Sequence, residues 1–132
     1  MKIAIVGSRK FGDLVRVAKL VEYFYSLYGD ELMIVSGGAK GVDTAAVDAA
    51  KARGIEWKEF LPDPKVKPFV KAAMERNSLI VEYADWVYAF YSVKRDSTGT
   101  VDVMHKAIMA EKLVGIYTPK DAFQSSRVSG PA

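Results

Sequence analysis

Short apolar runs alternate with helix-patterned segments along most of the chain, and this alternation constrains the fold more than any other feature. The apolar runs are too short for helices and most are followed by glycine, proline or serine, which predicts strands buried on both faces of a sheet. We expect strands at 3–6, 32–35, 55–61, 86–91 and 114–117, and helices at 13–28, 43–53, 68–83 and 100–112. The sequence therefore predicts βαβ units and a parallel sheet.

The fold class that follows is α/β, a single Rossmann-like domain whose five-stranded parallel sheet has helices on both faces. A chain of 132 residues has the size of one domain. We assign residues 1–118 to this domain and expect 119–132, which lacks periodicity, to form a flexible C-terminal tail. No apolar run approaches the ~20 residues that span a bilayer, so we expect a cytoplasmic protein without a membrane partner.

Composition excludes several kinds of site. The chain has no cysteine and a single histidine, His105, so disulfides, thiolate zinc sites, cysteine nucleophiles and histidine-rich metal sites are excluded. We therefore expect no metal and no cofactor. The formal net charge is +3, which permits an anionic partner without requiring one.

Three predicted loops between a strand and a helix combine glycine or hydroxyl residues with basic side chains. Parallel strands place such loops at one edge of the sheet, where ligands of α/β folds bind. Glycine lets a phosphate approach the backbone, and the N–H groups of a helix N-terminus favour an anion. The candidate ligand-binding residues in these loops are Gly7, Ser8, Arg9, Ser36, Gly37, Gly38, Lys40, Gly41, Asp43, Ser97, Thr98, Gly99 and Thr100.

Each loop taken singly also fits an ordinary β–α turn, in which glycine and serine serve turn geometry and helix capping. Asp43 has two readings: it orients a ribose hydroxyl, or it interacts with the helix dipole as acids in a first turn commonly do. We favour the second. Three anion-suited loops on one edge nevertheless predict a phosphate-bearing ligand.

These motifs together resemble the SLOG superfamily, in particular its small YspA-like members. The resemblance rests on Gly7-Ser8-Arg9, on the segment 35–43 (Val-Ser-Gly-Gly-Ala-Lys-Gly-Val-Asp), on Arg76-Asn77, on Ala84-Asp85 and on the segment 97–100 (Ser-Thr-Gly-Thr). It covers residues 1 to about 118, with the motifs in order. It implies a Rossmann-like domain that binds a nucleotide or nucleotide-derived ligand, and it adds Arg76 and Asn77 to the candidate ligand-binding residues.

Two relatives in this superfamily imply different activities. Lonely Guy phosphoribohydrolases release a base from a nucleoside monophosphate, and Arg76 and Gly99-Thr100 are similar to parts of their motifs. The position of their glutamate is occupied by Val103, which cannot take a proton. Asp102 is its neighbour, about 100° away on a helix. If the chain is an enzyme, it is an N-glycosidic hydrolase with Arg76 and Asp102 as the candidate catalytic residues.

DNA-processing protein A, which binds single-stranded DNA, resembles the chain at residues 36–43 and at Arg76-Asn77. Single-stranded nucleic acid is therefore an alternative partner, although the aromatic residues, among them Phe69 and Trp86, fit core packing better than base stacking. The function expected first is a nucleotide sensor or sequestering module without chemistry.

Three further expectations concern residues outside the loops. The tyrosines of the first helix, Tyr23, Tyr25 and Tyr28, suggest a second buried surface, and we expect a homodimer. His105 has no partner in the pattern and is not expected to be catalytic. Asp85 precedes a strand, at the opposite edge of the sheet from the loops, and we expect a structural role for it.

Overall fold

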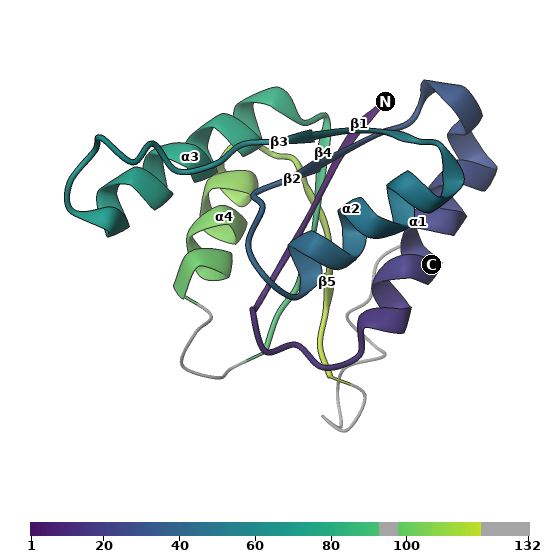
Figure 1. The fold of residues 1–132 in the computed structure, drawn as a ribbon, viewed down its shortest axis with the longest axis horizontal. Coiled ribbons are helices and arrows are strands. Elements are labelled where there is room, and N and C mark those ends of the chain that lie inside the picture. The colour runs from purple at the N-terminus through teal and green to yellow at the C-terminus, as the bar shows by residue number, and fades with distance from the viewer. Residues whose placement is uncertain (93–97, 120–132) are drawn as a thin grey trace.

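The structure, a computed structural model, describes residues 1–92 and 98–119 and contains one five-stranded parallel sheet with the strand order β3-β2-β1-β4-β5 (Figure 1). The strands are β1 (Lys2–Gly7), β2 (Met33–Ser36), β3 (Glu56–Glu59), β4 (Trp86–Phe90) and β5 (Leu113–Tyr117). The helices are α1 (Leu14–Tyr28), the single 3-10 turn η1 (Gly29–Glu31), α2 (Val42–Arg53), α3 (Phe69–Tyr83) and α4 (Thr98–Met109). The predicted fold class is confirmed.

Two apolar layers hold the domain together, one on each face of the sheet. The first layer packs α1 and α2 on one face of the sheet. Phe24 and Phe90 are its largest fully buried side chains, and the small Ala46 and Ala50 let α2 approach the sheet closely. The second layer packs α3 and α4 on the other face and includes Val6 and Val103. Figure 1 shows the two helix pairs on opposite sides of the strands. Alternate residues of β1 belong to opposite layers, as expected for a fully buried strand.

Two elements differ from the prediction by more than one residue at an end. The last helix begins at Thr98, two residues earlier than expected, and ends at Met109 rather than at Lys112. The third strand is limited to Glu56–Glu59, because it is an edge strand that pairs with β2 alone. Its four residues, Glu-Trp-Lys-Glu, are all exposed. Three of them are charged, which suits an edge strand better than a strand buried on both faces.

The tyrosines of α1 contact the core of their own domain. Tyr23, Tyr25 and Tyr28 are partly buried against the first apolar layer. The homodimer stays a prediction. Asp85 lies at the amino-terminal end of β4, and its Oδ2 accepts a hydrogen bond of 2.8 Å from the Lys2 amide, which ties β4 to β1.

The strand order determines where a ligand has room to bind. β1 pairs with β2 on one side and with β4 on the other, so the chain order reverses between β1 and β4. The loops that follow strands on either side of such a point diverge and leave a crevice at the carboxyl ends of the strands. Over the residues described, no helix combines the length and the hydropathy that a membrane span requires.

Candidate functional site

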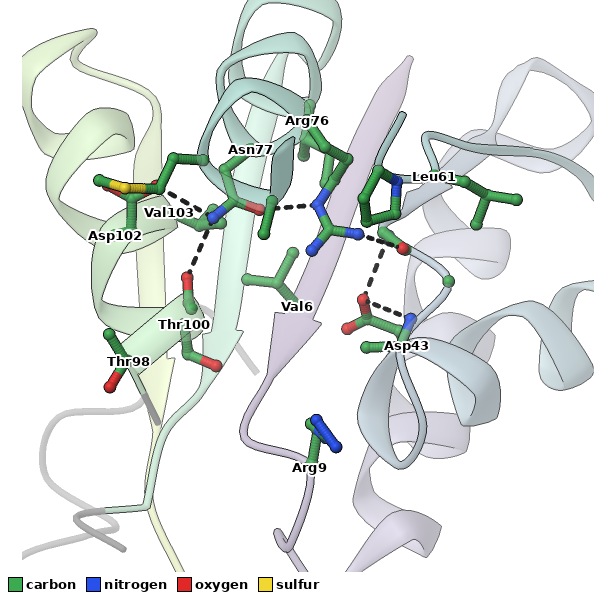
Figure 2. A pocket seen from close by; sticks show the side chains of 18 of the residues that line it. Val6, Arg9, Asp43, Leu61, Arg76, Asn77, Thr98, Thr100, Asp102 and Val103 are labelled. Atoms are coloured by element: carbon green, nitrogen blue, oxygen red, sulfur yellow. Dashed lines mark hydrogen bonds between the residues drawn. The ribbon is translucent and has the colours of Figure 1, made fainter. Parts of the chain in front are cut away.

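A cavity of about 530 Å³ opens at the carboxyl ends of β1 and β2, beneath α3 and α4 (Figure 2). Its wall combines polar groups from the predicted loops with apolar residues from the segment that leads into α3. The polar and glycine residues of the wall are Gly7, Arg9, Gly37, Gly38, Lys40, Asp43, Arg76, Asn77, Thr98, Gly99, Thr100 and Asp102. The apolar residues are Val6, Ala39, Leu61, Pro62, Phe69, Val70, Ala73, Met74, Ile80 and Val103.

The loop after β2 is folded around the buried carboxylate of Asp43. Oδ2 of Asp43 accepts the amide N–H groups of Gly37 (3.2 Å) and Ala39 (3.3 Å), and Ser36 Oγ accepts that of Gly38 (3.1 Å). The amides of Gly37, Gly38 and Ala39 are therefore engaged by side chains of the same segment. The loop forms one wall of the cavity.

Burial dominates the ionisation of Asp43. Removal from water raises the pKa of its carboxyl from 3.8 to about 6, against the opposing effects of the Ala39 amide, the Arg76 guanidinium and the Gly37 amide. The Asp43 carboxylate thus accepts hydrogen bonds from the backbone of its own loop, while the residue also lines the cavity.

Arg76 crosses the cavity from α3 to the same loop. Its Nη1 donates to the carbonyl oxygens of Gly37 and of Phe60, the latter at 3.4 Å, and its Nε donates to Asn77 Oδ1 at 2.8 Å. The guanidinium is half-buried, and desolvation lowers its pKa while Asp43 opposes the shift. Figure 2 shows the guanidinium projecting above Val6 between Asn77 and Asp43. Arg76 is therefore a part of the site and not of a solvated helix face.

Asn77 connects Arg76 to α4. It is 3% exposed, and its Nδ2 donates to Asp102 Oδ2 at 2.9 Å and to the Gly99 carbonyl at 3.4 Å. Lys106 Nζ donates to the same Oδ2 at 2.8 Å. Asp102 and Val103 both line the cavity, although neighbouring side chains on a helix point about 100° apart.

The amino-terminal turn of α4 faces the cavity with Thr98, Gly99 and Thr100. The first amides of a helix have no partner within it, and together with the helix dipole they favour an anion. A Cβ added to Gly99 would meet no atom within 4 Å, so the turn is open at this point. Arg9, an exposed residue of the first loop, also lines the cavity, and Figure 2 shows it below Asp43.

Three of the predicted ligand-binding residues do not line the cavity. Ser8 is buried, and its Oγ accepts the Ser92 amide at 3.1 Å, which joins the ends of β1 and β4. Ser36 supports its own loop. Gly41 has φ +84, and a Cβ there would lie 2.6 Å from the Arg9 carbonyl oxygen, so it lets the first and second loops touch. The predicted position Ser97 lies outside the described residues.

The sequence analysis missed the apolar side of the cavity. Leu61, Pro62, Phe69, Val70 and Met74 form it, and Phe69 is 71% exposed rather than packed in the core as expected. The sequence did carry one signal: Phe69 and Val70 directly follow Pro68 and occupy the first turn of α3, ahead of Ala72, the first residue of this helix that is buried. Exposed apolar side chains that gather around a cavity suit an aromatic or apolar part of a ligand.

The comparisons with known proteins agree with this fold. Residues 1–65 match the model of the family described as "YspA, cpYpsA-related SLOG family". The match confirms the resemblance to the SLOG superfamily. No curated protein matches the chain.

Solved structures of the same fold include two forms of DNA processing protein A (DprA). The chain is 23% identical to DprA from Streptococcus pneumoniae, with a TM-score of 0.65 over 89% of this chain and 49% of that one. It is 19% identical to DprA from Helicobacter pylori, described for its single-stranded DNA binding mode, with a TM-score of 0.70 over 89% of this chain and 64% of that one. The chain thus spans one half to two thirds of each DprA chain.

A third similar structure is TM1055, a structural genomics target. It is 17% identical, with a TM-score of 0.61, and the alignment covers 88% of this chain and 72% of that one. At these identities, the three structures support the five-stranded α/β fold.

Proposed function

We propose that this SLOG-type domain binds a nucleotide or nucleotide-derived ligand through its phosphate and acts as a sensor or sequestering module. One observation carries the proposal. A single cavity joins the open first turn of α4 and the cationic Arg9 to an apolar wall that includes Phe69 and Met74. A nucleotide has the same division, with an anionic phosphate at one end and an aromatic base at the other.

The phosphate belongs at the amino-terminal turn of α4. The amides of Gly37 and Ala39 are engaged by Asp43, whereas the first turn of α4 has amides without helical partners. Arg9 and Lys40 also line the cavity, and their charges favour an anionic ligand there. The apolar wall is left for the base, which gains by burial against it.

Gly99→Asp tests this placement. The new side chain has open space, and an acid in the first turn interacts favourably with the helix dipole, so we expect the variant to stay folded. Its charge occupies the place of the phosphate, and we expect affinity for nucleoside monophosphates to fall about tenfold or more, equivalent to about 1.4 kcal/mol. Isothermal titration calorimetry with AMP, GMP and ribose 5-phosphate measures the change.

The matched control is Gly99→Asn, which has nearly the same size without the charge and is expected to bind more tightly than the Asp variant. Arg9→Ala is expected to weaken the same ligands, because it removes a cation from the wall. Equal affinities of the wild type, Gly99→Asp and Arg9→Ala for a bound nucleotide would place the phosphate elsewhere.

Hydrolysis of an N-glycosidic bond is the alternative activity. Val103, at the position of the hydrolase glutamate, is buried in the second apolar layer and takes no proton. Asp102 is paired with Lys106. We therefore expect no free base from nucleoside monophosphates at high protein concentration, measured by chromatography; released base would move the assignment to a phosphoribohydrolase with Arg76 and Asp102.

Single-stranded nucleic acid is the second alternative, favoured by exposed Lys65, Lys67 and Lys71 close in the chain to the exposed Phe69. For binding of this kind, the logarithm of the association constant falls linearly with the logarithm of the salt concentration, with a slope proportional to the number of phosphates contacted. Fluorescence anisotropy with a labelled oligothymidine between low and moderate salt measures the slope. Binding of the oligonucleotide with a steep slope, and of no mononucleotide, would favour this alternative.

We also keep the homodimer and the cytoplasmic location as predictions. Ile108 and Met109 at the end of α4 are exposed apolar residues suited to a contact between copies. Sedimentation velocity over a range of protein concentrations decides between monomer and dimer.

A further inference from the structure

The carboxylate of Asp102 presents one oxygen that nothing in the described part of the chain satisfies. Asn77 Nδ2 and Lys106 Nζ both donate to Oδ2, at 2.9 and 2.8 Å, and no described residue donates to Oδ1. The side chain is 16% exposed and lines the cavity. A carboxylate oxygen only accepts hydrogen bonds, so Asp102 offers a ligand one acceptor and no donor.

Two donors hold the carboxylate in place, and each is fixed by a further hydrogen bond. Lys106 Nζ also donates to the Met74 carbonyl at 2.7 Å, which fixes the ammonium between α3 and α4. Asn77 is buried, and Arg76 Nε donates to its Oδ1 at 2.8 Å, so the amide has one orientation. The carboxylate is therefore oriented before a ligand arrives, and little conformational freedom remains to be lost on binding.

Asp102 also stands between the two ends of the cavity. It follows the amino-terminal turn of α4, where Thr98 and Gly99 face the cavity, by one helical turn. Lys106 Nζ, which donates to Asp102, also donates to the carbonyl of Met74, a residue of the apolar wall, so the carboxylate lies close to that wall as well. In a nucleoside 5′-phosphate the sugar lies between the phosphate and the base. Its hydroxyl groups are donors, which is what the free oxygen of Asp102 needs.

The other acid in the wall, Asp43, is less accessible than Asp102. Asp43 is 5% exposed, and its carboxylate accepts hydrogen bonds from the backbone of Gly37, Ala39 and Gly7. The remaining polar groups near the sugar position, among them Asn77 and Arg76, are engaged with each other and with the backbone.

We infer that Asp102 accepts a hydrogen bond from the ribose hydroxyls of the ligand, and that the domain selects ribonucleotides over deoxyribonucleotides. The inference rests on the proposed nucleotide site and names the sugar that the site takes. A hydrogen bond from a hydroxyl to an oriented carboxylate is of the stronger, charge-assisted kind. The selection also separates a ribonucleotide site from a site for single-stranded DNA, which has no 2′-hydroxyl.

The experiment compares AMP and GMP with their 2′-deoxy and 3′-deoxy counterparts by isothermal titration calorimetry on the full chain. We expect removal of at least one of the two hydroxyls to weaken binding about tenfold, in the range of one hydrogen bond to a charged group. Asp102→Ala is expected to bring the ratio of ribo to deoxy affinities to about one, since the acceptor is gone. The ratio is the readout, because a general disturbance of the site lowers both affinities and leaves their ratio unchanged.

Asp102→Asn is the second variant and keeps the shape of the side chain, so a reduced ratio in a stably folded protein supports the inference even if the alanine variant unfolds. Asp48→Asn, an exposed acid on α2 away from the cavity, is the matched control and is expected to keep the wild-type ratio. Nucleotides that bind with equal ribo and deoxy affinities, or a ratio that survives in Asp102→Ala, overturn the inference and leave the proposed function standing. Binding of no nucleotide in either form overturns both.

Discussion

Gly7→Ala is expected to lower the free energy of unfolding by about 3 kcal/mol, because it overpacks a site that cannot relax. An added Cβ would lie 2.5 Å from Val42 Cγ2 and 2.8 Å from the Phe90 carbonyl oxygen. Val42 is β-branched and fully buried, and the carbonyl belongs to a paired strand, so neither neighbour can move independently. Urea denaturation followed by circular dichroism measures the loss.

Gly12→Ala is the matched control for this prediction. A Cβ at Gly12 would meet no atom within 4 Å, so the same chemical change is expected to alter the free energy of unfolding by less than about 0.5 kcal/mol. Similar urea midpoints of unfolding for Gly7→Ala and the wild type would mean that Val42 of α2 does not lie against the carboxyl end of β1, and would contradict this prediction.

The second large effect concerns Asp43 and pH. Because burial raises its pKa from 3.8 to about 6 in the folded protein, the acid form is favoured by folding and the carboxylate is penalised. The contribution to stability is complete below pH 3.8 and is lost as the pH rises through 6. Relative to Asp43→Asn, which does not titrate, the wild type should lose about 3 kcal/mol over this range, at about 1.4 kcal/mol for each pKa unit.

Urea denaturation of both proteins in steps between pH 3.5 and pH 7.5 measures this difference. The comparison removes the titration of all other groups, which the two proteins share. Asp48→Asn, exposed on the same helix, is expected to follow the wild type at each pH. A constant difference between wild type and Asp43→Asn, or one that grows in the opposite direction, would mean that the loop amides and Arg76 outweigh burial at this carboxylate.

The elements of the fold could be predicted because each leaves a local signal. The run 3–6 is apolar throughout and Gly54 ends α2 with φ +77, so a strand buried on both faces and a helix end can both be read from neighbouring residues. The starts and ends that were misplaced depend on tertiary contacts. The end of β3 is set by its pairing with β2 alone, and no local pattern carries that information.

The site was predicted where it lies in loops and missed where it depends on contacts between distant residues. The loop residues Gly37 and Gly99 line the cavity because parallel strands bring such loops to one edge. The contact of Arg76 with Gly37, 39 residues away, requires α3 to cross the sheet at one particular place. The apolar wall around Phe69 also depends on where α3 crosses the sheet. In the sequence, the spacing of these apolar residues does not differ from that of residues on the core-facing side of a helix.

The division of the core into two layers has a consequence for how the chain folds. Residues 1–65, which match the family model, contain β1, β2 and β3 with α1 and α2, and so only the first layer. Ala4, Val6 and Val35 on the other face of these strands are covered by side chains from residues 80–107. We therefore expect that residues 1–65 do not fold by themselves, because one face of their strands would lack its apolar cover. During synthesis, the central strand β1 gains its second neighbour once β4 has left the ribosome, and the second cover of the sheet is complete only once α4 has followed.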